Sequence, residues 1–253
     1  MTGKSAWVTG GASGIGAAVV RKLAAYGRPV FVADASALPV DSPATGADVV
    51  DVRDRAALER SCQRAAGAGA GLGLAVLCAG IGSTEGSTCE TVDPQSYQRI
   101  VDINLTGVVH GIAVATPHLR GTGGSVVVIA SLAGLTPYPD NPFYAMTKAA
   151  VVALVRSLGP ALAREGIRIA AICPGFVDTP MIDPLRPVFA EAGFPLLHAD
   201  QVAAAVLRAE CEGESGTCWV LQPGREPAPY EFRGVPSPVR ADGTALDLPA
   251  SAK

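Results

Sequence analysis

The sequence predicts an α/β fold in which helices cover both faces of one doubly wound parallel sheet of about seven strands. Short apolar runs rich in valine, isoleucine and alanine alternate along the chain with longer stretches of helical periodicity. This alternation is typical of a parallel sheet that is covered on both faces. The 253 residues, of which 49% are hydrophobic, suffice for one large domain with a buried core.

The first half of the chain supplies four of the expected strands and three of the helices. Strands are predicted at 5–9, 30–33, 47–50 and 74–78, and helices at 14–26, from 54 to a glycine-rich loop at 67–71, and at about 93–116. Gly27 is placed to end the first helix, Asp54 to cap the second and Pro117 to end the third.

The second half continues the alternation of strands and helices up to residue 221, where the alternation ends. Strands are predicted at 125–130, 167–173 and 217–221, and a helix at 143–164, where Pro160 can introduce a kink. Residues 1–222 are therefore expected to form the single domain. Residues 223–253 are rich in proline and are expected to form an extended tail.

Composition excludes several classes of function. The net charge is −3 and no basic cluster occurs, which argues against nucleic-acid binding. No apolar run reaches 18 residues, so we expect no membrane span. The N-terminus lacks the pattern of a signal peptide, and a cytoplasmic location is the default expectation. The six cysteines show no metal-ligand or redox spacing, and no metal site is predicted.

A glycine-rich segment, Thr9-Gly10-Gly11-Ala12-Ser13-Gly14-Ile15-Gly16, joins the first strand to the first helix. Glycines at such a place let the backbone approach a pyrophosphate, and the helix N-terminus adds N–H groups and a favourable dipole. Asp34 ends the second strand, where a carboxylate accepts hydrogen bonds from ribose hydroxyls and repels a 2′-phosphate. The sequence thus predicts NAD rather than NADP. The alternative for the glycine-rich segment is an ordinary tight turn, and the alternative for Asp34 is a surface cap.

A tyrosine and a lysine lie four residues apart in the last long helix, in Tyr144-Ala145-Met146-Thr147-Lys148. Residues at this spacing share one helical face, and an ammonium beside a phenol favours the phenolate. We therefore expect Lys148 to lower the pKa of Tyr144 toward neutrality, so that the phenol can exchange a proton with a carbonyl oxygen. Ser131 follows a buried strand, and its hydroxyl can hydrogen-bond the same oxygen.

With these parts in this order, the chain resembles the short-chain dehydrogenase/reductase family over residues 5 to about 222, and the fold expected is of Rossmann type. The resemblance implies Asn104, Ser131, Tyr144 and Lys148 as catalytic residues, with Asn104 holding a water that links Lys148 to solvent. It implies a cofactor site of Gly10, Ser13, Gly14, Ile15, Gly16, Asp34, Asp51, Val52, Ala79, Gly80, Tyr144, Lys148, Pro174, Gly175, Val177 and Thr179.

Two questions about this site remain open: the role of Asp51 and the effect of the residues at 77 and 78. The Asp51 carboxylate can contact the adenine amine, or it can simply form a turn. Leu77 and Cys78 stand where the family usually has two asparagines, which puts the local rigidity of the site in question.

The family places a mobile substrate lid between residues 179 and 198, and here the lid is apolar. An apolar lid favours a small lipophilic alcohol or ketone, and the residues expected to contact it are Leu135, Tyr138, Met181 and Phe189. The leading hypothesis is NAD-dependent oxidation of a lipophilic secondary alcohol. An NADPH-type 3-oxoacyl or polyketide reductase and a non-catalytic nucleotide-binding protein are the alternatives.

The resemblance also implies a homotetramer or homodimer, formed through the helices at about 93–116 and 143–164. The second helix carries more apolar side chains than one sheet face needs, namely Ala149, Val152, Ala153, Val155 and Leu158. The tail is expected to lie ordered from residue 223 to about 238, against the lid or a partner subunit.

Overall fold

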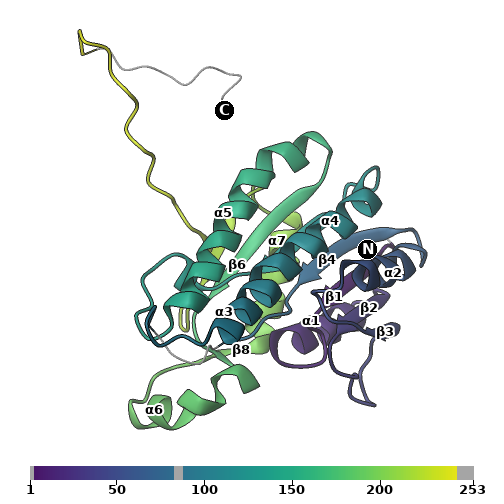
Figure 1. Ribbon diagram of the computed structural model, residues 1–253. Coiled ribbons are helices and arrows are strands. Elements are labelled where there is room, and N and C mark those ends of the chain that lie inside the picture. Colours follow the sequence, from purple (N-terminus) through teal and green to yellow (C-terminus); the bar gives the residue numbers. More distant parts are fainter. Residues whose placement is uncertain (1–2, 83–87, 244–253) are drawn as a thin grey trace.

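The computed structural model describes residues 3–82 and 88–243, and it shows one sheet with helices on both faces (Figure 1). The sheet has eight strands in the order β10-β9-β6-β5-β4-β1-β2-β3, and every neighbouring pair is parallel except β10 with β9. The strands are β1 (Ser5–Thr9), β2 (Val30–Asp34), β3 (Gly46–Val49), β4 (Leu72–Leu77), β5 (Ser125–Ile129), β6 (Arg168–Pro174), β9 (Cys218–Leu221) and β10 (Ala228–Pro229). The predicted doubly wound sheet is confirmed, with the short β10 as an added edge strand.

The helices divide between the two faces of the sheet. They are α1 (Gly14–Ala25), α2 (Arg55–Ala66), α3 (Pro94–Val101), α4 (Gly107–Leu119), α5 (Pro142–Arg164), α6 (Arg186–Glu191) and α7 (Ala199–Cys211). One core cluster joins α2, α4 and α5 to the sheet, and the other joins α1 and α7 to it. Trp7 and Val8 belong to different clusters because successive side chains of a strand point to opposite faces.

Two helical stretches, Pro94–Leu119 and Pro142–Arg164, are long and apolar enough to cross a membrane by length and composition alone. Both pack on the sheet of this domain and contribute to its core. Val152 and Val155, which we expected on an interface between subunits, are buried in this core. Their burial accounts for part of the apolar surplus of α5.

The third predicted helix differs from expectation in two ways. A π-helical turn, Asp102–Thr106, separates α3 from α4, and α4 continues past Pro117 to Leu119. Proline removes one backbone donor. The next turn nevertheless closes, because the backbone N–H of Arg120 donates to the carbonyl of Thr116 at 3.1 Å. Our expectation that Pro117 ends this helix was therefore wrong.

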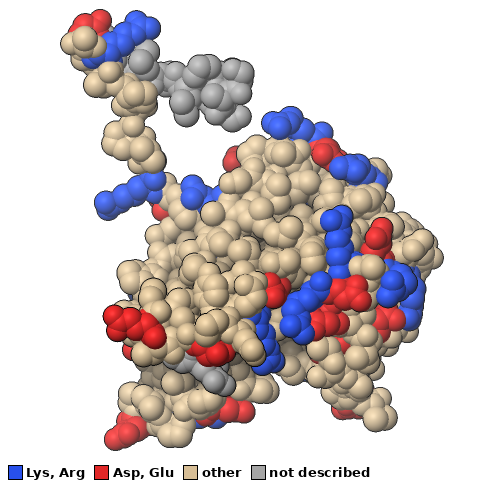
Figure 2. Space-filling model, in the orientation of Figure 1, with Lys and Arg blue, Asp and Glu red and all other residues tan. Residues whose placement is uncertain are grey.

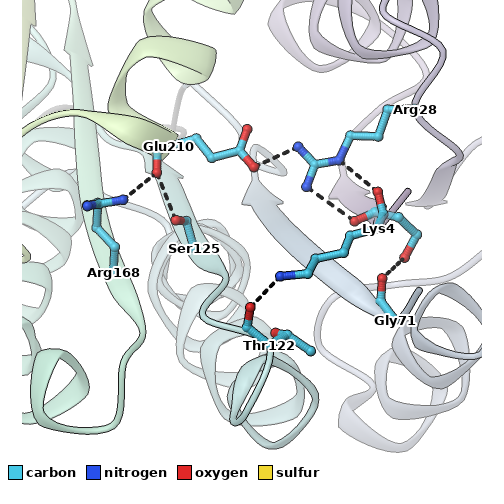
Figure 3. A network of polar contacts seen from close by, with 8 residues as sticks. Lys4, Arg28, Gly71, Thr122, Ser125, Arg168 and Glu210 are labelled. Atoms are coloured by element: carbon cyan, nitrogen blue, oxygen red, sulfur yellow. Dashed lines mark hydrogen bonds and ion pairs between the residues drawn. The ribbon is translucent and has the colours of Figure 1, made fainter. Parts of the chain in front are cut away.

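A polar network ties the amino ends of β1, β2, β5 and β6 to the end of α7 (Figure 3). The guanidinium of Arg28 contacts the carboxylate of Glu210 at 2.7 Å and also donates to the carbonyl of Lys4 at 3.2 Å. The carbonyl of Glu210 accepts from Ser125 and from Arg168, at 3.0 and 2.7 Å. Because this network is at the amino edge of the sheet, the opposite, carboxyl edge is left for the site described below.

The first part of the tail packs on its own domain and not on the lid, which was one of its two expected neighbours; contact with a partner subunit, the other, stays a prediction. β10 pairs with β9, and the backbone N–H of Tyr230 donates to the carbonyl of Cys218 at 2.8 Å. The ring of Phe232 lies 3.6 Å from the guanidinium of Arg156 on α5. Beyond Phe232 the chain extends away from the domain (Figure 1). The tail thus packs on the sheet edge and α5 rather than on the lid, because the edge of β9 offers free backbone groups.

Candidate functional site

The residues singled out in the sequence meet at the carboxyl edge of the sheet. The glycine-rich loop follows β1, Asp34 ends β2, Ala79 and Gly80 follow β4, Ser131 follows β5, and Pro174 and Gly175 lie at the end of β6. In doubly wound sheets this edge is where ligands bind. The parallel order of the strands therefore brings these distant segments together.

Close backbone packing shapes the glycine-rich loop. Gly10 has a φ of +70°, and a Cβ on it would lie 2.6 Å from the backbone nitrogen of Ala79. A Cβ on Gly16 would lie 1.9 Å from the carbonyl oxygen of Gly10. The Ser13 side chain does not cap α1, whose first N–H groups are those of Gly14 and Ile15. This cradle fits the pyrophosphate of a dinucleotide.

Thr9, the first residue of the glycine motif, hydrogen-bonds the segment in which the family usually has two asparagines. Its hydroxyl oxygen accepts from the backbone N–H groups of Cys78 and Ala79, at 3.2 and 3.4 Å. The loops after β1 and β4 are thereby joined. Sequence reasoning placed Thr9 in the glycine motif without giving it this role.

Two carboxylates lie at the ends of β2 and β3. The Asp34 carboxylate accepts from the backbone N–H groups of Ala12 and Ser36, both at 2.9 Å, so it borders the glycine-rich loop. Asp51 instead pairs with Arg53, whose hydrogen bond holds the pKa of this carboxyl below its usual value. Its side chain also accepts the backbone N–H of Arg53, which matches the turn-forming interpretation. The following residue, Val52, is buried.

Ser131, Tyr144 and Lys148 converge on one point. The Ser131 hydroxyl caps a short 3₁₀ helix, Leu132–Gly134, and also hydrogen-bonds the phenol of Tyr144. The Lys148 ammonium is buried, donates to the carbonyl of Ile129 at 2.9 Å, and lies 5.6 Å from the centre of the Tyr144 ring. A hydroxyl, a phenol and a cation thus share one small region beside the cofactor cradle.

The electrostatics of this region differ from our expectation. Desolvation raises the pKa of Tyr144 to about 12, and the hydrogen bond from Ser131 only partly opposes this increase. Desolvation also lowers the pKa of Lys148 to about 8. The predicted lowering of the Tyr144 pKa is therefore wrong for the protein alone. Removal of water from both groups outweighs the attraction between cation and phenolate.

Asn104 lies in the π-helical turn and is fully buried. Its amide donates to the carbonyl of Ile81 at 2.9 Å and accepts the backbone N–H of Ile81 at 2.8 Å. A Cβ on Gly80 would lie 3.3 Å from the Asn104 oxygen and 3.7 Å from the Lys148 nitrogen. Through these two hydrogen bonds Asn104 holds the loop after β4 next to Lys148. That Asn104 binds a water remains a prediction.

Two positioning residues were missed by the sequence analysis. Asn141 caps α5 by accepting the backbone N–H of Tyr144 at 3.2 Å, and its amide also donates to the carbonyl of Gly82. An asparagine just before Pro142 was the available signal, since this pair is typical of a helix start. A Cβ on Gly134 would lie 2.7 Å from the Lys148 backbone, so glycine lets the loop after Ser131 pack on α5. No local pattern marks that contact.

The predicted lid consists of a 3₁₀ helix, Pro180–Leu185, and α6, and it ends in β8 (Leu197–His198), which pairs with β7 (Val177–Asp178). Met181 reaches the loop after β4, because a Cβ on Gly82 would lie 2.8 Å from its Cγ. Phe189 joins an aromatic cluster with Tyr138, so both predicted substrate residues border the same region. Leu135 is partly buried against the core on the α5 side of the sheet.

Comparisons with known proteins find a matching family model, related sequences and similar solved structures. A family model described as short chain dehydrogenase matches residues 4–188. Cis-4-hydroxycyclohexanecarboxylate dehydrogenase of Sinomonas cyclohexanicum is 33% identical over 184 residues, 69% of this chain and 74% of that protein. 2-Dehydro-3-deoxy-L-rhamnonate dehydrogenase (NAD(+)) of Sphingomonas sp. strain SKA58 is 34% identical over 190 residues, 72% and 76% of the two chains. The crystal structure of 3-ketoacyl-(acyl-carrier-protein) reductase from Brucella melitensis complexed with NADH has a TM-score of 0.77 and 26% identity, covering 88% of this chain and 98% of that chain.

Asn141 offers a test of how α5, the helix that carries Tyr144 and Lys148, is positioned. Asn141→Ser keeps a capping oxygen for α5 but removes the donor to Gly82, whereas Asn141→Ala removes both. We expect turnover to fall about tenfold in Asn141→Ser and further in Asn141→Ala, with NADH affinity changed less than threefold. Steady-state rates and NADH fluorescence titration measure the two quantities. Unchanged turnover in Asn141→Ala would contradict this role.

Proposed function

The chain belongs to the short-chain dehydrogenase/reductase family, and on this premise we propose that it oxidises a lipophilic secondary alcohol to a ketone with NAD. The observation that carries the proposal is the convergence of Ser131, Tyr144 and Lys148 beside the glycine cradle. The family is one of oxidoreductases that use a nicotinamide cofactor. The alcohol, the direction and the choice of NAD are parts of the proposal.

The chain's own residues account for the movement of the proton. When bound, the nicotinamide cofactor supplies the hydride chemistry, and Gly10, Gly14 and Gly16 would hold its pyrophosphate. Ser131 orients the alcohol oxygen by a hydrogen bond, and Tyr144 takes its proton. In the protein alone, burial disfavours the phenolate that this step needs, and the positive charge of an oxidised nicotinamide would favour it. With a pKa of about 8, Lys148 can itself release a proton near neutral pH.

Two kinds of observation support an alcohol with an apolar carbon skeleton. Met181 lies against Gly82 in the loop after β4, and Phe189 packs on Phe176, whose other side meets Tyr138 of the loop after Ser131. The relative from Sinomonas acts, by its name, on a hydroxyl group of a cyclohexane ring. A secondary alcohol on a small ring is therefore the first substrate class to examine.

The choice of NAD rests on Asp34. Its carboxylate borders the glycine-rich loop, and the neighbouring Ala35 and Ser36 carry no positive charge. A 2′-phosphate at this place would meet a negative charge without a compensating cation. The names of the Sphingomonas relative and of the Brucella structure include NAD(+) and NADH.

Reduction of a 3-oxoacyl group is the second candidate, and the likeness to the Brucella reductase favours it. In this reaction the same three side chains work in reverse, with Tyr144 as the acid. The high pKa of Tyr144 in the protein alone suits a proton donor. Rates in both directions distinguish the two candidates. A non-catalytic nucleotide-binding protein would show no turnover in either direction.

We also infer a dimer or tetramer formed through α4 and α5. The surface over these helices is largely free of charged side chains in the view of Figure 2. Val109, Met146, Ala149 and Ala153 are exposed there. A symmetric contact would remove this apolar surface from water. Light scattering at micromolar concentration should give at least twice the mass of one chain, and a monomer would contradict the inference.

The proposed function is tested by offering secondary alcohols with NAD and measuring the NADH absorbance band. We expect cyclic and branched apolar alcohols to be oxidised. Tyr144→Phe should lower turnover at least a thousandfold, because the ring stays but the exchangeable proton is lost. NADH binding, measured by fluorescence, should change little. If Tyr144→Phe kept most of its rate, another residue would have to move the proton.

Cofactor choice is tested with a conservative substitution. Asp34→Asn keeps an oxygen acceptor for the Ala12 N–H but removes the charge. We expect NAD to exceed NADP at least a hundredfold in kcat/KM for the natural protein, and the ratio to fall at least tenfold in Asp34→Asn. Asp41→Asn, at an exposed position after the same strand, is the matched control. Equal efficiency with NADP in the natural protein would contradict the choice of NAD.

A further inference from the structure

The segment 175–179 has two sides with different neighbours. Val177 and Thr179 are buried, and a Cβ on Gly14 would lie 3.2 Å from the Thr179 methyl group, so this side faces the glycine-rich loop. Asp178 pairs instead with Arg186 of the lid at 2.5 Å, and Phe176 packs on the lid as well. The alternation of side chains along an extended backbone explains this division. One short segment therefore supports both the cofactor loop and the lid.

Phe176 is the central ring of a four-ring cluster. Its ring centre lies 4.6 Å from Phe189 and 5.9 Å from Phe194, both in the lid. On the other side it meets Tyr138 edge to face at 6.4 Å. These distances are those of favourable aromatic pairs. Phe176 is only partly buried, so some of its ring surface stays available.

The cluster extends to the reacting centre. Tyr138 belongs to the loop that follows Ser131, and it is near enough to Tyr144 to raise the pKa of that phenol. A Cβ on Gly175 would lie 3.5 Å from Leu132, the residue next to Ser131. A substrate whose oxygen meets Ser131 and Tyr144 would thus have its carbon skeleton beside Phe176.

We propose that Phe176 determines substrate specificity by presenting its ring to the carbon skeleton, and that it favours secondary alcohols whose hydroxyl carbon belongs to a ring. The inference rests on the proposed function and adds the residue that selects the substrate. A rigid ring packs against an aromatic wall without losing internal rotations, whereas a flexible chain must be ordered to do so.

The test compares cyclohexanol with 2-hexanol, which have the same number of carbon atoms. We expect Phe176→Ala to lower kcat/KM for cyclohexanol about thirtyfold and for 2-hexanol less than threefold. Phe176→Leu, which keeps most of the apolar volume and is the less disruptive change, should lower the cyclohexanol value about tenfold. Phe232→Ala is the matched control, because its ring stacks on Arg156 rather than on the lid. It should leave the ratio between the two alcohols unchanged.

A binding measurement separates this inference from the proposed function. In the Tyr144→Phe background, cyclohexanone and 2-hexanone are titrated into the complex with NADH and read by NADH fluorescence. Tighter binding of cyclohexanone that is lost on Phe176→Leu supports the inference, even if the natural protein oxidises neither alcohol, which would contradict only the proposed function. Equal binding of the two ketones, or an equal loss of both in the Phe176 variants, would overturn it.

Discussion

The close approach of backbone segments at the carboxyl edge of the sheet is the constraint on which the site depends. Gly10 lies against Ala79, Gly80 against Asn104, and Gly134 against Lys148, each at a distance that leaves no room for a Cβ or barely accommodates one. The parallel strands set the spacing of these segments, and glycine allows them to meet. Larger side chains there would push apart the glycine-rich loop and the segments that carry the proposed catalytic residues.

This packing has an electrostatic consequence. Because the segments meet closely, Lys148 and Tyr144 are largely removed from water, and each pKa moves toward the neutral form of its group. The Lys148 ammonium donates a hydrogen bond to the backbone carbonyl of Ile129 rather than to a carboxylate. This carbonyl carries no opposing charge, yet burial still keeps the pKa of the Tyr144 phenol high in the protein alone.

The lid is attached to the same edge by two different interactions. The ion pair of Arg186 with Asp178 links the lid to the segment before it, and the aromatic cluster around Phe176 fixes the lid through apolar contact. Exposed ion pairs contribute little stability on their own, so the aromatic contacts carry most of the attachment. Both anchors belong to the segment that also touches the glycine-rich loop. This one segment therefore contacts the glycine-rich loop and continues directly into the lid.

The sequence by itself determined the alternating architecture, because period and turn residues are local properties. It placed the strand 5–9 at its observed bounds, the cap at Asp54, and Tyr144 and Lys148 on one helix. The tertiary structure alone decided what depends on contacts between distant segments. It carried α4 past Pro117, packed the tail on β9 and α5, and raised the Tyr144 pKa by desolvation. The double hydrogen bond of Asn141 and the central position of Phe176 join loops that are far apart along the chain, and no local pattern encodes such proximity.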